Sequence, residues 1–512
     1  MKKYYITTPI YYSNWVPHIG HSYSSLLADS IARSKRMLWY QVKFSTGVDE
    51  NSQKAVIKAE EEWKETMKYL DEMAGKHQAV WDGLEITYTD FIRTTSDKHH
   101  KFVREILDKV HENGDIYQWE YKGLYCVGCE SFKKEIDLID KDGKKVCPDH
   151  LTEPDKLVEK NWFFSLSKYE DKLKDFYKNN PDFIKPAYRF NEIKAFVEWG
   201  LEDFSISRET NTFGIKLPFD EKSVSYVWFD ALINYLTLCQ WEDKDFWPAN
   251  IHIMAKDIAR FHAIYWPAML MSAGYELPKN EIVTWFLTVD GQKISKSLGN
   301  VIDPVEFSEK YSRDALVLYL FYDVKVGNDA DFSWERFRGL YDSMLIGGWG
   351  NLVFRVSKMA EKNEITEVKA NLEDLKHIDN ELLQAILSGN IENILENYIE
   401  KADLQSYIRN WYDLVQACNK YIEETQPWKL IKEDEKAGKQ VLQNLVWLIE
   451  KLGILSAPFL TESWWKVQNI LDRQLIDTKT TMNEWKFQEL LQENNFTVNL
   501  KPEIIYKKVE ED

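Results

Sequence analysis

The segment YYITTPIYYSNWVPHIGH, residues 4–21, decides how the fold begins. Residues 4–12 read as a β-strand, and the stretch from His18 to Met37 has the apolar spacing of a helix. A second strand pattern covers Val42 to Thr46. A strand, a helix and a strand in this order predict the start of a parallel sheet, of the kind that binds nucleotides.

The next part of the chain alternates between helical and strand patterns. Residues 53–115 read as largely helical, whereas residues 120–160 are broken by Gly, Pro and Cys and predict an inserted knuckle. Strand patterns return at Ser223 to Val227, Ile251 to Met254 and Glu281 to Val289. We expect these three strands to complete the parallel sheet.

Helical patterns dominate after about Trp334. Long amphipathic stretches run from Leu404 to Thr425 and from Gln440 to Leu455. They predict a terminal helical bundle. The expected fold class is therefore α/β, a Rossmann-like parallel sheet with an insertion, followed by an all-α region.

Composition limits the kind of protein. The 512 residues, of which 44% are hydrophobic and 29% charged, predict an ordinary soluble protein of two to four structural units. The sequence has no apolar run of membrane length and no leader pattern at its start, so we expect a cytoplasmic protein. The formal net charge of -18 argues against indiscriminate binding of nucleic acid but permits a local basic track.

Three of the five cysteines lie close together in the predicted knuckle. Cys126 and Cys129 form one pair, and Cys147 and His150 form another. Three thiolates and an imidazole in two chelating pairs suit a tetrahedral Zn²⁺ that is closed to water and therefore structural. Thiols beside a turn, without metal, are the alternative, and another thiophilic ion is also compatible.

The motif His18-Ile19-Gly20-His21 stands where the first strand passes into the first helix. Exposed backbone N–H groups and the helix dipole attract phosphate at such a position. Gly20 allows a nucleotide to approach closely, and the two imidazoles share one helical face and can donate hydrogen bonds to it. Taken alone the motif is weak evidence, because most short matches of this kind are turn or core histidines.

A second motif, Asp290-Gly291-Gln292-Lys293-Ile294-Ser295-Lys296-Ser297-Leu298-Gly299-Asn300, is polar and bounded by glycines. It predicts a mobile loop whose two lysines reach one site and can close over diphosphate. A solvated basic turn would be the preferred interpretation of such a stretch without context. Here the loop follows the last predicted strand of the same sheet.

Together the two motifs resemble those of class I aminoacyl-tRNA synthetases. Thr7 to Tyr12, Tyr226 to Tyr235 and Phe261 to Leu270 are similar specifically to bacterial methionyl-tRNA synthetases of the one-zinc type, and the likeness covers nearly the whole chain. The resemblance implies ATP-dependent charging of tRNA(Met), initiator and elongator, with L-methionine through methionyl-adenylate. It implies neither a membrane nor a DNA partner.

The implied chemistry needs no nucleophilic side chain. The methionine carboxylate attacks the α-phosphate of ATP, so the enzyme positions the reactants and neutralises charge, and Mg²⁺ accompanies the ATP. The adenylate then passes to the 2′-OH of the terminal adenosine of the tRNA. No side chain is marked by the sequence as a general base.

The resemblance also implies roles for individual residues. ATP binding falls to His18, Gly20, His21, Lys293, Ser295, Lys296 and Ser297, of which the two histidines and two lysines are catalytic. The methionine pocket falls to Ile10, Tyr12, Asp49, Trp228, Ala231, Tyr235 and His262, with Asp49 pairing with the substrate ammonium. Contact with the anticodon falls to Asn351, Arg355 and Trp428.

Some of these residues also have a purely structural interpretation. The aromatic residues of the pocket are also typical of ordinary core, which is the expected place of most of the 20 Trp and 27 Tyr in the chain, and only the order of the motifs favours the pocket. Lys358 and Lys362 follow Arg355 at helical spacing, and a basic edge and a salt-bridged surface are equally compatible with them.

The implied domain division follows the order of the motifs. It comprises the first half of the Rossmann domain, the connective insertion with the zinc knuckle, the second half of the Rossmann domain, a stem-contact region with the lysine loop, and the helical anticodon-binding domain. The corresponding ranges are 1–115, 116–220, 221–285, 286–345 and 346–512.

Three places depart from the family pattern. Gly47-Val48-Asp49-Glu50-Asn51-Ser52 stands where Gly-x-Asp-Glu-His-Gly is usual, Ala255 precedes Lys256-Asp257 in place of Gly, and Thr284-Trp285 replaces His-Gly. These changes surround the expected site, but the two core motifs are intact. We therefore still expect activity.

Other enzymes and proteins fit the sequence less well. Isoleucine, valine and leucine synthetases carry a large editing insertion, for which the insertion here is too short. A tRNA-independent nucleotidyltransferase would not need the helical bundle, and a silent RNA-binding relative would not need both histidines and both lysines. We expect a monomer, because the sequence shows no appended dimerisation domain.

Overall fold

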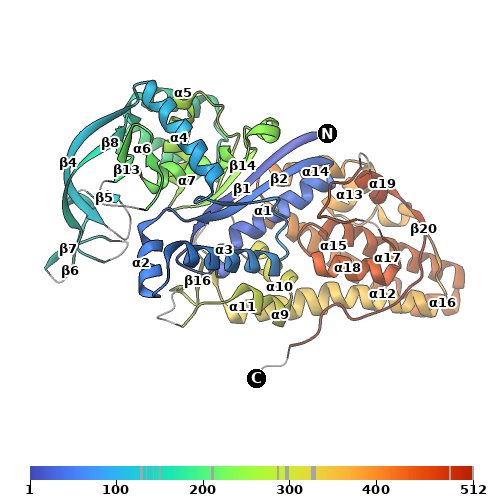
Figure 1. Cartoon of the computed structure of the whole chain (residues 1–512). Coiled ribbons are helices and arrows are strands. Elements are labelled where there is room, and N and C mark those ends of the chain that lie inside the picture. The colour runs from blue at the N-terminus through green and yellow to red at the C-terminus, as the bar shows by residue number, and fades with distance from the viewer. Residues whose placement is uncertain are drawn as a thin grey trace.

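The computed structural model describes residues 1–509 apart from 127–130, 134, 142, 149–150, 209–212, 285–286, 295–298, 324–329, 475 and 484–485, and apart from the side chains of 121–122, 131–132, 136, 156–159, 241, 293 and 330. Three parts lie in a row (Figure 1). A lobe containing β4, Ile116–Cys126, and β8, Asp155–Phe164, stands at one end. The sheet with β1, Lys2–Tyr12, and β2, Tyr40–Asp49, lies in the middle, and a helical region forms the other end.

The middle part is a six-stranded sheet in the order β3-β2-β1-β14-β15-β9, and every neighbouring pair is parallel. Helix α1, Ile19–Met37, connects the first two strands, which confirms the expected strand–helix–strand opening. The strands are β1 Lys2–Tyr12, β2 Tyr40–Asp49, β3 Asp90–Arg93, β9 Ile184–Lys185, β14 Ile251–Ala255 and β15 Glu281–Thr284.

The expected sheet strand Ser223–Val227 was wrong, and the expected strand Glu281–Val289 was confirmed only over Glu281–Thr284, which is β15. β13, Asp220–Ser225, belongs to a separate antiparallel sheet with β11, Ser207–Arg208, and β12, Lys216–Leu217. Val227 already begins helix α7, Val227–Thr237. Leu287–Val289, β16, pairs with β17, Gln292–Lys293, and with β18, Ala330–Phe332, instead of extending β15. An alternating pattern predicts a strand, but the choice of partner depends on residues distant in sequence.

The predicted helical stretch 53–115 contains α2 Gln53–Glu61, α3 Thr66–Gly83 and α4 Asp97–Glu112, and strand β3 interrupts it. β3 lies very close to β2. A Cβ on Gly47 would stand 2.2 Å from the carbonyl oxygen of Ile92, so only glycine permits this approach.

The inserted lobe is built on the long antiparallel pair of β4, Ile116–Cys126, and β8, Asp155–Phe164. The small hairpin of β6 and β7 projects from the outer end of this lobe (Figure 1). The other elements of this part are β5 Ser131–Lys133, β6 Ile139–Lys141, β7 Lys144–Val146, α5 Glu170–Asn179, α6 Ala187–Glu198, β10 Phe204–Ser205, β11 Ser207–Arg208 and β12 Lys216–Leu217.

A π-helical turn, Phe261–Tyr265, runs into helix α8, Trp266–Ala273, beside the central sheet. The remaining elements lead from the sheet into the helical end. They are α9 Pro304–Tyr311, α10 Arg313–Tyr322, β18 Ala330–Phe332, α11 Trp334–Leu340, a π-helix at Tyr341–Gly350, α12 Asn351–Lys362, β19 Glu367–Lys369, α13 Glu381–Ser388, α14 Ile391–Glu400, α15 Leu404–Thr425, α16 Pro427–Glu433, α17 Glu435–Ser456, α18 Thr461–Leu471, α19 Lys486–Gln492 and β20 Asn495–Thr497.

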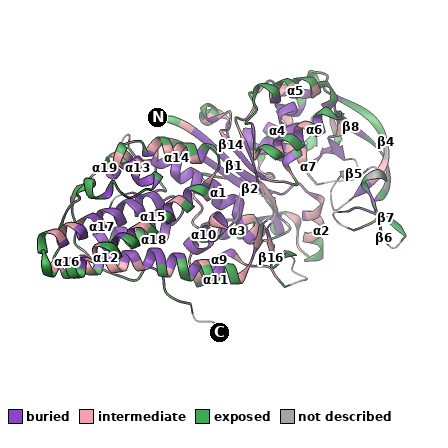
Figure 2. Cartoon of the chain, turned by 180° about the vertical axis from the view of Figure 1, so that it is seen from behind, coloured by how far each residue is buried: buried purple, intermediate pink, exposed green. Residues whose placement is uncertain are grey.

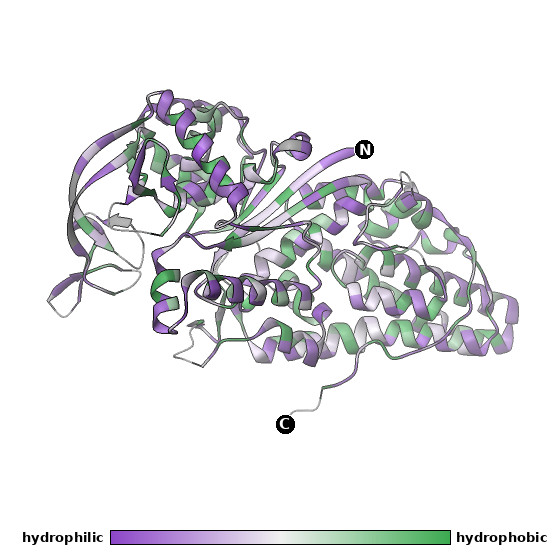
Figure 3. Cartoon of the chain, viewed as in Figure 1, coloured by the Kyte–Doolittle hydropathy of each residue, from purple (hydrophilic) through white to green (hydrophobic). Residues whose placement is uncertain are grey.

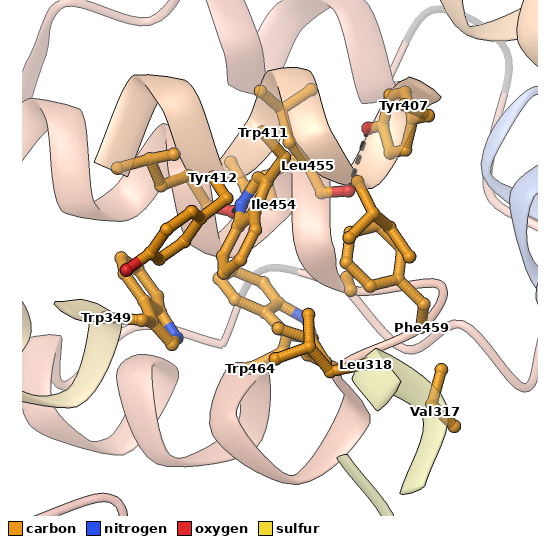
Figure 4. Close-up of a cluster of buried hydrophobic side chains, with 14 of the residues drawn as sticks. Val317, Leu318, Trp349, Tyr407, Trp411, Tyr412, Ile454, Leu455, Phe459 and Trp464 are labelled. Carbon is orange, nitrogen blue, oxygen red and sulfur yellow. Dashed lines mark hydrogen bonds between the residues drawn. The ribbon is translucent and has the colours of Figure 1, made fainter. Parts of the chain in front are cut away.

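The helical end has an aromatic core (Figure 4). The indole of Trp411 donates to the carbonyl of Leu452 over 3.0 Å, and the phenol of Tyr407 donates to the carbonyl of Leu455 over 2.9 Å. Trp349 meets Trp411 edge-on with ring centroids 5.5 Å apart. The polar atoms of Trp411 and Tyr407 are therefore satisfied by α17 backbone, whereas Nε1 of the buried Trp349 has no hydrogen-bond partner among the described residues.

Helices α1 and α10 are buried on nearly all sides, whereas α12 and α15 are amphipathic. Buried residues run through β1, α1, α10 and α17 (Figure 2), and hydrophobic and hydrophilic residues alternate along α15 and α12 (Figure 3). Within the described residues, no helix combines the length and the apolarity that crossing a bilayer requires.

Candidate active site

The expected site lies at the carboxyl ends of the parallel strands. β1 and β14 are neighbours at the centre of the sheet, and β2 and β3 extend to one side while β15 and β9 extend to the other. In such sheets ligands bind where the strand order reverses, outside the carboxyl ends. In register, Tyr12 at the end of β1 is opposite Asp49 at the end of β2.

The two histidines of the first motif cap helix α1 with their own rings. Nδ1 of His18 accepts from the backbone N–H of Gly20 at 3.1 Å, and Nδ1 of His21 accepts from the backbone N–H of His18 at 3.2 Å. The ring centroids are 4.0 Å apart. The motif is therefore a capping box made of imidazoles in place of the usual hydroxyl and carboxylate.

This arrangement fixes the protonation of both rings. Because each Nδ1 accepts a hydrogen bond, the ring proton of the neutral form must be on Nε2. Burial lowers the pKa of His18 to about 4, and burial together with the neighbouring His18 and His77 lowers that of His21 to about 3. Both rings are thus neutral at physiological pH, and each has an Nε2–H donor available.

The described ends of the lysine loop meet the start of α1. The backbone N–H of Ile19 donates to the carbonyl of Ile302 at 3.1 Å, and a Cβ on Gly20 would lie 3.5 Å from Cδ1 of Ile294. The predicted Ser295, Lys296 and Ser297, and the side chain of Lys293, lie outside the described residues. The two motifs, 275 positions apart in sequence counted from His18 to Lys293, are adjacent in space at Ile294 and Ile302.

Helix α7 carries three of the predicted pocket residues, Trp228, Ala231 and Tyr235, at spacings that place them on one side. The Trp228 ring stacks on Phe261, with centroids 4.0 Å apart and an angle of 5°. The phenol of Tyr235 lies 2.8 Å from Nε2 of His262. The structure thus brings these residues together between α7 and the π-helical turn.

Two residues of this region were missed from sequence. Phe261 is the stacking partner of Trp228, and His252 on β14 lies under Tyr235 with ring centroids 4.3 Å apart. Nδ1 of His252 is 2.8 Å from the hydroxyl of Thr7, and its Nε2 accepts from the indole of Trp266 at 3.3 Å. Burial lowers its pKa well below the usual value. A buried histidine on a central strand was the only available clue.

The other predicted pocket residues lie at the strand ends. Ile10 is opposite Gly47 in register, and Asp49 is 4% exposed. The ammonium of Lys54 lies 4.4 Å above the ring of Tyr12. A carboxylate therefore lies buried beside aromatic and aliphatic groups, a setting that suits a substrate with an ammonium and an apolar side chain.

One family departure has a direct structural account. Thr284 is buried, its hydroxyl is 3.1 Å from that of Ser24 on α1, and it donates to the carbonyl of Met254 at 3.2 Å. It therefore links the end of β15 to α1 and β14. Trp285 lies outside the described residues.

The predicted metal ligands are only partly described. Cys126, at the end of β4, and Cys147, after β7, are buried thiols. The backbone N–H of Leu151 donates to the carbonyl of Cys147 at 2.8 Å, so Cys147 begins a tight turn. Cys129 and His150 lie outside the described residues, and the described ones contain no group of three metal-ligating side chains.

The predicted anticodon residues lie at the helical end. Asn351 and Arg355 are on α12, and Trp428, 39% exposed, is on α16. Figure 1 places α12 and α16 at the end of the molecule opposite the β4 lobe. Arg355 pairs with Glu423 on α15 at 2.8 Å, three residues before the turn that leads into α16.

Of the two lysines that follow Arg355, Lys358 fits the salt-bridge interpretation better. Lys358 pairs with Glu361 on the same helix at 2.7 Å, and both side chains are exposed. An exposed pair of this kind contributes little to stability, but Glu361 neutralises the positive charge of Lys358 that binding to tRNA would require.

Comparison with known proteins gives consistent matches over the whole chain. Residues 4–357 match the family model described as tRNA synthetases class I (M), and residues 369–512 match the anticodon binding domain of methionyl tRNA ligase. A methionine–tRNA ligase of Caldanaerobacter subterraneus subsp. tengcongensis is 42% identical over 467 residues, 90% of this chain and 72% of the relative. One of Thermotoga maritima is 39% identical over 501 residues, 94% of this chain and 77% of the relative.

The fold comparison agrees. The structure of Mycobacterium tuberculosis methionyl-tRNA synthetase in complex with methionyl-adenylate is similar with a TM-score of 0.90 at 32% identity. The match covers 99% of this chain and 100% of that chain.

Proposed function

This chain belongs to the methionyl-tRNA synthetases of class I, and on that premise we propose which of its residues carry each step of the reaction. The reaction is the ATP-dependent attachment of L-methionine to tRNA through methionyl-adenylate, with AMP and diphosphate released. The observation that carries the assignment is the meeting of the α1 N-terminus with the ends of the lysine loop, Ile294 and Ile302.

ATP binding is assigned to the start of α1 and to the lysine loop. The Nε2–H groups of His18 and His21 donate to phosphate oxygens, and Gly20 leaves room for the nucleotide. Lys293 and Lys296 neutralise the diphosphate, with Ser295 and Ser297 as hydrogen-bond donors. Magnesium accompanying ATP supplies further neutralisation of phosphate charge.

The first step is a displacement at phosphorus. A carboxylate oxygen of methionine forms a bond to the α-phosphorus of ATP, and the bond from that phosphorus to the bridging oxygen of diphosphate breaks. Negative charge moves onto the leaving diphosphate, where neutral imidazole donors and lysine cations stabilise it without having to release or take up a proton.

The methionine pocket is assigned to the residues between the strand ends and α7. Asp49 pairs with the substrate ammonium, and the thioether lies against aromatic faces, which polarizable sulfur favours. The assigned residues are Ile10, Tyr12, Asp49, Trp228, Ala231, Tyr235 and His262.

The second step takes place on the tRNA. The 2′-hydroxyl of the terminal adenosine attacks the carbonyl carbon of the adenylate, an ester bond forms, the bond from that carbon to the phosphate oxygen of AMP breaks, and the hydroxyl proton leaves with the AMP phosphate. Asn351, Arg355 and Trp428 contact the anticodon, where unpaired bases stack on an exposed indole and accept hydrogen bonds from amide and guanidinium groups.

The finer assignments complete the proposal. The substrates are initiator and elongator tRNA(Met), not DNA, and the enzyme acts as a monomer in the cytoplasm. The division of the chain at 115/116, 220/221, 285/286 and 345/346 remains a prediction.

The knuckle is proposed to hold one structural Zn²⁺ through Cys126, Cys129, Cys147 and His150. Two buried thiols at the ends of β4 and β7 fit this donor set. Measuring bound zinc in the purified protein and in Cys126→Ser tests it. One zinc per chain, lost in the variant, supports the site, and a chain that folds without metal contradicts it.

Charging of tRNA(Met) transcripts with methionine tests the whole proposal. We expect both the initiator and the elongator transcript to be charged, and a transcript with a changed anticodon to be charged far more slowly. Equal charging of the changed transcript would contradict the role assigned to α12 and α16.

A further inference from the structure

Asn51 connects three elements of the catalytic part. It follows β2, it is 2% exposed, and its Nδ2 donates to the carbonyl of Thr94 at 3.0 Å and to Oδ2 of Asp230 at 2.8 Å. Thr94 directly follows β3, and Asp230 lies in the first turn of α7. We call these two hydrogen bonds the Asn51 bridge.

The orientation of the Asn51 amide is determined by its neighbours. A carbonyl oxygen and a carboxylate oxygen both accept, so only the NH₂ group can face them, and its two hydrogens are both used. Oδ1 of Asn51 has no hydrogen-bond partner among the described residues. A carboxylate at this position would lose both donors and would add a negative charge next to Asp230.

Helix α7 needs an anchor at this end. Its N-cap residue, Tyr226, makes no side-chain cap hydrogen bond, so no cap side chain holds the first turn. That turn carries Trp228, whose ring stacks on Phe261. The last turn has an anchor of its own, because Nδ1 of His99 lies 2.8 Å from the hydroxyl of Thr237.

We propose that Asn51 is a positioning residue for amino-acid recognition, acting through Asp230 on the first turn of α7. The Asn51 bridge sets the distance of α7 from the ends of β2 and β3. It thereby places Trp228 and Ala231 in the pocket that receives the substrate side chain. The inference rests on the proposed function in that this substrate is methionine.

The donors and acceptors of the Asn51 bridge predict that substituting Asn51 has a larger effect than substituting Asp230. Asn51→Asp places two carboxylates together, and we expect KM for methionine in diphosphate exchange to rise about tenfold or more, with KM for ATP within about twofold. Asp230→Asn alone keeps an oxygen that accepts from Nδ2 of Asn51, so we expect KM for methionine to rise by at most about threefold.

The double variant is the decisive member of the set. Asn51→Asp with Asp230→Asn exchanges the amide and the carboxylate, and one hydrogen bond re-forms in the opposite direction. We expect its KM for methionine to be at least about threefold lower than that of Asn51→Asp. A double variant no better than Asn51→Asp, or a KM for ATP that rises as much as that for methionine, would overturn the proposal.

Amide hydrogen exchange tests whether the Asn51 bridge holds the first turn of α7, and it needs no substrate. In ligand-free protein, Asn51→Ala, which removes both bonds without adding charge, should speed amide exchange over residues 227–231. The matched control, Thr237→Val, removes the anchor at the other end and should speed exchange only over residues 233–237. Unchanged exchange at 227–231 in Asn51→Ala contradicts the proposal even if Asn51→Asp does not fold.

The same pair of measurements separates the two proposals. If the wild-type protein shows no methionine-dependent exchange of diphosphate, the proposed function fails, and hydrogen exchange still decides whether Asn51 positions α7.

Discussion

The hydroxyl of Tyr235 lies 2.8 Å from Nε2 of His262, and Nδ1 of the His262 imidazole lies 3.0 Å from the carbonyl oxygen of Ile258. Because a carbonyl oxygen only accepts, Nδ1 carries the ring proton and Nε2 accepts from the phenol. Burial lowers the pKa of His262 to about 4, so the pair is neutral at physiological pH. Tyr235 and His262 therefore act in the proposed methionine pocket through the direction of their hydrogen bond and not through charge.

Tyr235→Phe should raise KM for methionine by about five- to tenfold, because His262 loses its donor and about 1 kcal/mol of hydrogen-bond energy. Methionine-dependent diphosphate exchange measures it. Tyr177→Phe is the matched control, since the phenol of Tyr177 donates to the carbonyl of Ala263 in the same turn but was not assigned to the pocket. Equal effects of the two variants would contradict the assignment.

Gly20→Ala should weaken ATP binding. A Cβ there would lie 3.0 Å from Cε1 and 3.2 Å from Nδ1 of His18, so the ring must move and its cap to the Gly20 amide must weaken. We expect KM for ATP to rise about tenfold, measured by exchange at varied ATP. Gly75→Ala in α3 meets no atom within 4 Å and is the control. A Gly20→Ala enzyme with unchanged KM for ATP would count against the role of His18.

Trp428→Ala should raise KM for tRNA in aminoacylation by roughly 5- to 100-fold, the value of one base stacked on an aromatic ring. The exchange reaction, which needs no tRNA, separates loss of binding from loss of folding. Trp465→Ala removes a comparably exposed tryptophan, 44% against 39%, from the same helical end. If both variants bind tRNA equally poorly, Trp428 has no specific contact.

Acid should destabilise the native state partly through His77. Burial lowers its pKa to about 4, although the carbonyl of Trp15 opposes this with a hydrogen bond, and the unfolded value is near 6.5. Between these values only the unfolded state takes up the proton, so stability falls as pH falls, by up to about 1.4 kcal/mol per pH unit.

Glutamine at this position does not titrate. His77→Gln should therefore lose roughly 2 kcal/mol less stability than the wild type between pH 7.5 and pH 5.0. Urea unfolding at both pH values measures the difference. Parallel losses in the two proteins would show that His77 is protonated in the native state.

Local patterns predicted much of the fold. Helix α15 was expected from Leu404 to Thr425 and spans those residues, and the junction at His18 was predicted because a strand pattern changes there to helical spacing. The sheet membership of residues 223–227 and 287–289 was not predicted correctly, since pairing partners are chosen by packing across the whole chain.

The residues of the site also fall into those that were predicted from sequence and those that were not. His18 and His21 were found because their motif is contiguous, whereas Phe261 and His252 act through neighbours on other elements. Glu281 is a further case: its side chain is fully buried, neither carboxylate oxygen has a hydrogen-bond partner among the described residues, and burial raises its pKa well above the usual value. No pattern in the segment around it distinguishes such a carboxyl from an exposed one.

The histidine motif and the lysine loop together are proposed to activate methionine. Exchange of labelled diphosphate into ATP, measured with each amino acid in turn and with Lys296→Ala beside the wild type, tests this proposal most directly. We expect exchange with methionine alone and a loss of about a hundredfold or more in the variant, since removal of one charge-stabilising group costs about that much. Exchange driven by another amino acid, or undiminished in Lys296→Ala, would contradict it.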